Sequence, residues 1–462
     1  MKGDFSRDTF DPRHHYTRVL MQQGRVHLDA DLNEQSAISQ HYLQALAADL
    51  IGPAGGPAGT AGFGISTDAA VGKNLGKRLD PGDFMIMPGR YYVNGAMCEN
   101  PQVLLYSEQT GYPFDGNTTV DALAALGSYV VYLDVWERYV AAVEEPFIAE
   151  VALGGPDTAG RAQLTWQVRV LPATGEDPVN NQAFWADSLA RTVPLMAARA
   201  EPPATNNDPC TIEPGARYRG LENQLYRIEV HAPGVAAVQG QGATFKWSRE
   251  NGSVVMALSG VPAVDATAQT TTVQLATLGR DTDLGLVVGG WVELVDDAST
   301  LRHSASPLLR VHSIERDTFT VALEGVADPR VGTDPALHPY LRRWDHDGDP
   351  VAGGAVALAE SIPGQPVWID LEDGVQATFL ANDQGVPSDY STGDYWLVPA
   401  RTATGDVQWP NDGSAAALNP QPLPPRGERH AYAGLSAVGP DPAGGPNPVH
   451  TELRKFFARL AT

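Results

Sequence analysis

The stretch from Tyr129 to Pro172 constrains the fold of this chain most. Its first seven residues and the run Leu164–Val170 are rich in strand-forming residues, so both ends read as well-packed β-strands. Between them, Gly-Gly-Pro-Asp at 154–157 combines residues that tolerate positive φ with a proline, which indicates a tight corner. Residues 222–256 hold two more expected strands and an Asn-Gly turn. We therefore expect a body built from β-strands.

The composition supports a β-rich chain and excludes several classes. With 462 residues, 43% of them hydrophobic, the chain can bury the cores of two to four domains. Its 47 glycines and 36 prolines favour short strands joined by tight turns. The net charge of −23 argues against a nucleic-acid groove, because a phosphate backbone would be repelled. The two cysteines, Cys98 and Cys210, lie far apart and predict neither a disulfide framework nor a zinc site.

The first 25 residues read as an extended arm, because they carry charges and aromatic side chains without a period. Such an arm has no core of its own, so we expect its hydrophobic side chains to be buried against a neighbouring chain. Four residues are the expected docking anchors: Phe5, Phe10, Tyr16 and Leu20.

Residues 26–62 predict one long amphipathic helix followed by a flexible Gly/Pro connector. The helix is capped at Asp29 or Asp31, runs for about five turns and ends at Gly52. Its apolar stripe needs a partner, which is either the body of its own chain or a neighbouring subunit. The stripe consists of Leu32, Ile38, Tyr42, Leu46 and Leu50.

The middle of the chain predicts a multi-domain, mainly β fold. Residues 63–261 together with 329–404 are expected to form the main β body. Roughly five short strands follow one another at 262–328, which predicts an inserted small barrel of SH3-like or OB-like type. Two similar strings, 245–249 and 341–345, flank this insertion and are expected to lie in the parent sheet.

The last third adds strands and a proline-rich tail. Residues 366–379 predict a hairpin with a Glu-Asp-Gly turn, and 393–401 predict a strand central to the body. Residues 405–462 are rich in proline and glycine, so they are expected to be extended in part and to close with a short helix.

Several strings resemble a known family, among them KGDFSRDTFDP, VYLDVWER, EVALGGPDTAGR, ATFKWSRENGSVV, RRWDHDG, WIDLEDGVQATF and TGDYWLVPAR. On these strings the chain resembles an uncharacterised bacterial family found beside genes for phage-tail-like contractile injection systems and related prophage tails. The resemblance runs from Met1 to the C-terminal segment. It implies a non-enzymatic structural part at the baseplate end, as an extension, a cage or a fibre-like attachment, and it carries over no catalytic residue.

Enzymatic chemistry has little support in the sequence. Acids lie near two tryptophans, as paired carboxylates beside a sugar platform would: Asp370, Glu372 and Asp373 near Trp368, and Asp134 and Glu137 on either side of Trp136. Acids in hairpins more often face solvent or cap a turn. No GxSxG, HExxH, P-loop or dinucleotide motif is present.

One string is a candidate calcium loop. Asp345, Asp347 and Asp349 alternate as calcium ligands do, but the distal glutamate of an EF-hand is missing. A solvated turn is the simpler account, and calcium is the one cofactor that the sequence suggests.

The sequence therefore predicts a non-enzymatic subunit of a contractile, phage-tail-like particle, which contacts baseplate or tail proteins and forms a ring or cage with its own copies. The alternative is a carbohydrate- or receptor-binding module that recognises the target surface. Because the N-terminus lacks a signal peptide and no apolar window reaches eighteen residues, we expect synthesis in the cytoplasm and no membrane span. The particle itself is either cytoplasmic or released.

Overall fold

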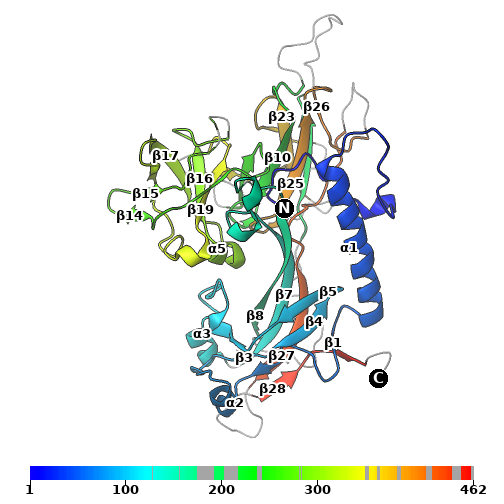
Figure 1. Ribbon diagram of the computed structural model, residues 1–462, viewed down its shortest axis with the longest axis vertical. Helices are drawn as coiled ribbons and strands as arrows, with labels where there is room; N and C mark the ends of the chain where they lie inside the picture. The colour runs from blue at the N-terminus through cyan, green and yellow to red at the C-terminus, as the bar shows by residue number, and fades with distance from the viewer. Residues whose placement is uncertain are drawn as a thin grey trace, which may run out of the picture.

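A computed structural model describes residues 1–126, 128–155, 157–173, 192–201, 217–236, 242–279, 281, 284–348, 353–361, 365–381, 387–412, 419–439 and 449–458. These residues form a mainly β molecule, as the sequence predicts. Three groups of sheets, each around its own hydrophobic core, are arranged as three lobes (Figure 1). We call them lobes A, B and C.

Lobe A is organised by the two longest strands, β7 (Tyr129–Val140) and β8 (Arg161–Pro172), which pair antiparallel along their whole length. This confirms the two strands expected at the ends of 129–172. β27 (Ala431–Gly439) pairs with the other edge of β7, and β28 (Val449–Glu452) pairs with β27. The C-terminal part of the chain therefore completes the sheet that the organising strands begin.

Two smaller sheets and two short helices complete lobe A. Their elements are β1 (Ala54–Pro57), β4 (Gly89–Val93), β5 (Ala96–Asn100) and β29 (Phe456–Phe457), then β2 (Ile65–Ser66), β3 (Met85–Ile86) and β6 (Leu104–Leu105), with α2 (Ala69–Asn74) and α3 (Val120–Ala125). The core between the sheets includes Phe63, Tyr91, Val131, Leu133 and Val168.

Two expectations for this lobe are wrong. Residues 52–64 are not a simple connector, because they contain β1 and the fully buried Phe63. The short terminal helix is also not formed in the described part: residues 449–457 carry β28 and β29, which pair with β27 and β1. Strand pairing overrides the helical pattern of this segment, as tertiary contacts commonly do.

Lobe B is built around β10 (Gln224–Val230), which lies between β12 (Thr244–Ser248) and β25 (Tyr395–Arg401). Its other strands are β20 (Val356–Ala357), β26 (Asp406–Val407), β9 (Leu195–Ala200), β21 (Glu360–Ser361), β22 (Ile369–Asp370), β23 (Val375–Leu380), β11 (Gly234–Val235) and β24 (Asp389–Tyr390). β22 and β23 form the expected hairpin, with Asp373 and Gly374 at φ 48° and 80°.

Both faces of β10 are buried, and they differ in chemistry. Tyr226, Ile228 and Val230 face the core of lobe B. The alternate residues Arg227 and Glu229 point to the opposite face, because successive strand residues alternate. That face is covered by lobe C and by the N-terminal residues, so charged side chains are buried where the lobes meet.

Lobe C is a seven-stranded sheet in the order β13-β19-β16-β17-β18-β15-β14. Its elements are β13 (Val255–Ala257), β14 (Ala263–Asp265), β15 (Thr270–Gln274), β16 (Trp291–Val295), α5 (Asp297–Arg302), β17 (Leu308–Glu315), β18 (Thr320–Glu324) and β19 (Tyr340–Trp344). A bridge between Leu258 and Leu275 links the end of β13 to the end of β15, so the sheet curls around its core.

The boundaries of lobe C differ from the expected insertion at 262–328, because the sheet includes β13 and β19 on either side. The two flanking strings also lie in different sheets: 244–248 is β12 of lobe B, whereas 340–344 is β19 of lobe C. They meet at the junction, where the Asp345 backbone N–H donates to the Trp247 carbonyl at 2.9 Å.

The long helix α1 (Asp29–Ile51) lies along one side of the molecule, beside lobes A and B (Figure 1). It is preceded by a short 3-10 turn, η1 (Pro12–His14), and ends at Gly52. Among the described residues, no helix combines the length and the apolar character that a bilayer crossing requires.

Candidate functional site

The first eleven residues, which we call the leader, lie on the body of their own chain. Asn251 donates from its amide to the carbonyls of Met1 (3.0 Å) and Gly3 (2.8 Å). Phe5 packs on a patch formed by Leu225, Tyr395 and Leu397, and the Arg401 guanidinium donates to the Ser6 carbonyl at 2.7 Å. The expectation that this arm finds no burial within its own chain is therefore wrong for its first half.

Lys2 of the leader joins a buried charge cluster at the junction of lobes B and C. Its ammonium lies 3.0 Å from Glu229, which also contacts Arg227 and lies 3.7 Å from Lys246. Lys246 lies 2.6 Å from Glu293, whose carboxylate also accepts a hydrogen bond from the Trp344 indole at 3.0 Å.

The cations of this cluster decide the charge state of Glu229. Burial by itself would raise its pKa, but Arg227, Lys2 and Lys246 outweigh burial and hold the pKa well below its usual range. Every carboxylate of the cluster is matched by cations, so the arrangement locks the lobes and the leader together rather than offering a free acid or base.

A hollow of about 290 Å³ opens beside the leader, lined by Asp4, Arg7, Glu250 and Arg401 among others. Burial, together with Asp345 and Asp4, raises the pKa of Glu250 to about 7. A carboxyl of that kind suits proton transfer. Asp4 of the leader lines the same hollow, so the hollow brings a second carboxyl near Glu250.

The expected anchors divide into two groups. Phe5 and Phe10 lie against their own chain, Phe10 with its ring 5.7 Å from that of His41 on α1. Tyr16 and Leu20 are 58% and 70% exposed. The residues that follow continue this exposed apolar surface, and between 16 and 50 it comprises Tyr16, Leu20, Met21, Val26, Leu28, Leu32, Tyr42, Leu43, Leu46 and Leu50. We call this set the outer apolar surface.

Helix α1 presents half of the outer apolar surface, five of its ten residues, because the helix buries little of itself. Of its residues only Ala30 and Ile38 are buried. The predicted stripe is therefore split: Ile38 faces the body, whereas Leu32, Tyr42, Leu46 and Leu50 face outward. Polar contacts hold the helix in place, including Ser6 to Asp29 at 2.6 Å.

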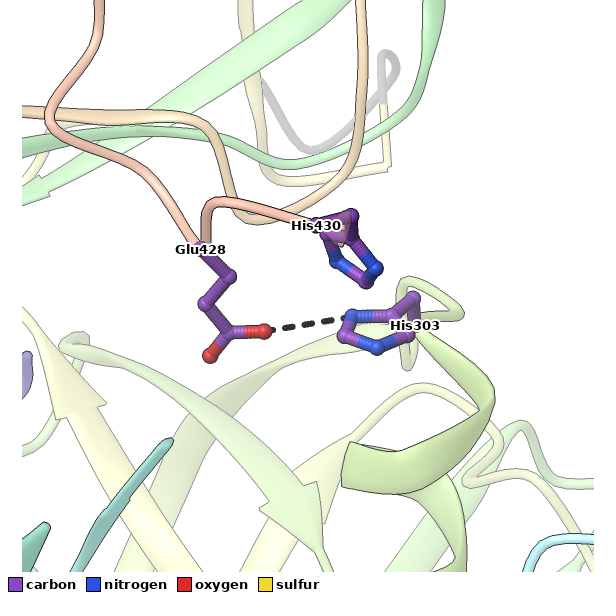
Figure 2. A group of neighbouring side chains, drawn as sticks. All are labelled: His303, Glu428 and His430. Atoms are coloured by element: carbon purple, nitrogen blue, oxygen red, sulfur yellow. Dashed lines mark ion pairs between the residues drawn. The ribbon is translucent and has the colours of Figure 1, made fainter. Parts of the chain in front are cut away.

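A second constellation lies where β7, α5 and the segment before β27 meet, and it consists of His303, Glu428 and His430 (Figure 2). His303 follows α5 directly, with a φ of 52° that turns the chain. Its Nδ1 lies 3.3 Å from Oε2 of Glu428. One ligand atom from each residue lies within 4.8 Å of the other two.

The neighbours of this constellation fix its rings. Asp134 on β7 lies with Oδ1 2.6 Å from Nδ1 of His430. Trp136, two residues along β7, stacks on His430 with ring centroids 5.0 Å apart and meets His303 edge-on at 4.6 Å. The orientation of both imidazoles is therefore set by one strand of lobe A.

Burial is the main influence on the charge of His303. Burial, and to a smaller extent His430, Arg169 and Lys2, lower its pKa well below the ordinary value, so the ring is neutral near pH 7. Its Nε2 is buried without a hydrogen-bond partner. Neutral imidazole nitrogens and a carboxylate oxygen are ligands that Zn²⁺ and related ions accept.

The candidates from the sequence are engaged elsewhere. Asp345 lies 3.1 Å from Nε of Arg343, Asp347 is exposed, and Asp349 lies outside the described residues. The calcium loop therefore stays a prediction.

The acids suggested for a glycosidase are also engaged. Glu372 accepts hydrogen bonds from Tyr226 (3.0 Å) and Arg249 (2.6 Å). The guanidinium of Arg199 covers the ring of Trp368 at 4.0 Å.

Comparison with known families assigns the chain. The family model described as "Family of unknown function (DUF6519)" matches residues 1–184 and 179–444. The chain belongs to the DUF6519 family. No match was found among curated proteins.

Sequence reasoning missed the histidine constellation of this DUF6519 protein. His303 and the pair Glu428 and His430 are separated by more than a hundred residues, so no spacing pattern connects them. The one local signal was Glu-Arg-His at 428–430, which carries two ligand types two residues apart directly before a strand.

Proposed function

We propose that this DUF6519 protein is a non-enzymatic structural subunit of a contractile, phage-tail-like particle, at its baseplate end. It attaches to neighbouring subunits through the outer apolar surface. The assignment to such a particle is supported by the resemblance of the sequence to the family found beside genes for contractile injection systems. Attachment to neighbouring subunits is supported by the exposure of the outer apolar surface. Copies of the chain in a ring or cage are the partners that the proposal favours.

The single observation that carries the attachment is the concentration of exposed apolar side chains. Of 26 large hydrophobic residues that are exposed in the described chain, ten belong to the outer apolar surface between 16 and 50. Scattered exposed apolar residues are ordinary, but ten of them between residues 16 and 50, five of which lie on α1, indicate an interaction site.

The spacing on α1 suggests the form of the partner. Positions 32, 36, 39, 43, 46 and 50 recur at intervals of three and four, and leucine occupies the first and the last three of them. Intervals of this kind give one face suited to a second helix. Because Ser36 and Ser39 interrupt the apolar face, the contact is centred on Leu43, Leu46 and Leu50.

We also propose that the curled sheet of lobe C is a small barrel of SH3-like or OB-like type, supported by the Leu258–Leu275 bridge between the ends of β13 and β15. In a structural subunit such a barrel acts as a rigid spacer.

The test changes the outer apolar surface and leaves the fold intact. In Leu43→Glu/Leu46→Glu, two exposed leucines acquire charge, and we expect the chain to stay folded but to be lost from purified particles. The matched control is Asn33→Asp/Gln40→Glu, which adds the same charge at exposed positions beside the stripe without replacing a leucine and should be incorporated normally. Normal incorporation of the leucine variant would contradict the proposal.

The alternative proposal is a carbohydrate- or receptor-binding module of the same particle. Sugar platforms usually need exposed aromatic rings. None of the eight tryptophans that the structure describes is exposed, and four of them donate their indole N–H within the chain, namely Trp166, Trp344, Trp396 and Trp409. Glycan binding by the isolated chain would favour this alternative.

A further inference from the structure

We propose that His303, Glu428 and His430 form a binding site for one divalent transition-metal ion, with Zn²⁺ as the best fit. The site goes beyond the proposed attachment function, and it does not depend on it. Two imidazoles and one carboxylate make up the donor set, which suits Zn²⁺ better than the all-oxygen preference of Ca²⁺ or Mg²⁺.

The separation of the donor atoms supports this ion. Zinc ligands lie about 2.0–2.2 Å from the metal in a tetrahedron, so neighbouring donors are about 3.3–3.6 Å apart. Nδ1 of His303 and Oε2 of Glu428 are 3.3 Å apart. The third donor, on His430, lies within 4.8 Å of both, so an approach of at most about 1.5 Å brings the three donors to this spacing.

The surroundings of His430 are those of a metal ligand. Histidines that bind metals commonly donate their second ring N–H to a carboxylate, which fixes the tautomer and the ring orientation. Asp134 occupies that place, with Oδ1 2.6 Å from Nδ1 of His430. Nε2 is then left as the donor to the metal. Asp134 is itself held by Arg169 at 3.4 Å, and its side chain is only 6% exposed.

The ordinary explanation is a structural histidine cluster without a metal, and one feature counts against it. A core histidine normally has both ring nitrogens hydrogen-bonded, because a buried polar atom without a partner costs roughly 1–3 kcal/mol. Nε2 of His303 is buried without a hydrogen-bond partner, whereas its Nδ1 lies 3.3 Å from the Glu428 carboxylate. His303 is therefore not a fully hydrogen-bonded core histidine, and the nitrogen proposed as the metal ligand is Nδ1, which faces Glu428.

The location predicts what the ion would do. His303 belongs to lobe C, Glu428 and His430 lie in the segment that leads into β27, and the orienting Asp134 belongs to β7 of lobe A. A metal ion here would link lobe C to the β28-β27-β7-β8 sheet of lobe A. Because the ligands come together only in the folded chain, binding free energy would add to folding free energy.

The experiment uses the full chain without a polyhistidine tag, stripped with a chelator and then titrated with Zn²⁺. We expect one Zn²⁺ per chain by mass spectrometry of the metal content, and a higher unfolding temperature with Zn²⁺ than without. Co²⁺ in place of Zn²⁺ should give visible d–d absorption, which reports on coordination directly. The Asp134→Asn variant should bind about 10–100-fold more weakly, as changes in outer-shell partners do.

Matched variants decide the outcome. His430→Gln should lose the bound Zn²⁺ and the Co²⁺ absorption, whereas His312→Gln should keep both. His312 also lies 3.0 Å from a carboxylate, that of Glu324, but on an exposed part of lobe C. If His430→Gln fails to fold, Glu428→Gln replaces it, because that side chain is partly exposed. Equal binding by the wild-type chain and these ligand variants, or no binding by the wild-type chain, overturns the proposal.

Discussion

Replacing Glu229 by glutamine should destabilise this protein strongly, although it changes only one atom of the side chain. Glu229 is 2% exposed and serves three cations at once: Lys2, Arg227 and Lys246. After the change, Lys246 keeps its contact with Glu293 at 2.6 Å. Arg227 loses the only carboxylate that it contacts among the described residues, so a buried guanidinium is left without its counter-ion.

The expected cost is about 3–5 kcal/mol, which is the range found when one partner of a buried ion pair is removed. Coulomb attraction at the protein surface gives a much smaller figure, because water screens exposed charges. The contacts that remain to Arg227 are neutral: the Met1 carbonyl at 3.3 Å, Oδ1 of Asn251 at 3.4 Å and the ring of Tyr395 at 3.6 Å. None of them carries the charge of the lost carboxylate.

The assay is unfolding in urea, followed by tryptophan fluorescence, because tryptophans lie in all three lobes. The matched control is Glu99→Gln, an exposed glutamate 3.9 Å from Arg90, for which we expect a change below about 1 kcal/mol. A second variant, Arg227→Met/Glu229→Met, removes both charges and should cost less than Glu229→Gln alone. If Glu229→Gln lowers the free energy of unfolding no more than the exposed control does, the charge cluster does not hold the lobes and the leader together, and the reasoning is refuted.

Three further predictions concern the fold. Gly95→Ala should lower the free energy of unfolding by about 1–3 kcal/mol, as measured in urea. Gly95 has φ 77°, and an added Cβ would lie 2.0 Å from a backbone oxygen of α1. Phe379→Ala, at a fully buried ring in lobe B, should cost about 3–5 kcal/mol in the same assay. Burial lowers the pKa of His231 to about 3 and that of His346 to about 4. Each of these histidines takes up a proton near pH 6.5 in the unfolded chain but stays neutral in the folded one. Lowering the pH from 7 to 5 should therefore reduce the free energy of unfolding by about 2 kcal/mol for each histidine. The raised pKa of Glu250 has the opposite effect, because it makes the fold more stable as the pH falls. Stability against pH is therefore measured in the Glu250→Gln variant.

Regular strands could be predicted from the sequence where local pattern and tertiary pairing agree. The dense strand formers of 129–135 and 164–170 predict the two strands that pair as β7 and β8, and the Glu-Asp-Gly turn predicts the hairpin of β22 and β23. Local residue preference and long-range contact favour the same structure there.

Prediction failed where contacts with a distant part of the same chain determine the local structure. β27 has the sequence AYAGLSAVG, whose small residues favour strands only weakly. It becomes a strand because β7 offers it an open edge, and a register shift between Gly434 and Ser436 adjusts the fit. The leader is similar: no periodicity in its sequence reveals that Glu229 and Asn251 hold it on its own body. The histidine constellation needs three distant segments, and a single sequence shows none of their proximity.

The placement of β27 also affects how the protein is made. The ribosome completes Tyr129 about 300 residues before Ala431, the first residue of the strand that covers the free edge of β7. During that interval β7 has its neighbour β8 on one side and an unpaired row of backbone groups on the other. Such an open edge can pair with strands of other chains and aggregate. A truncated chain that stops before residue 431 would keep this open edge permanently, so fragments that end there are poor candidates for expression, however well bounded they look by sequence.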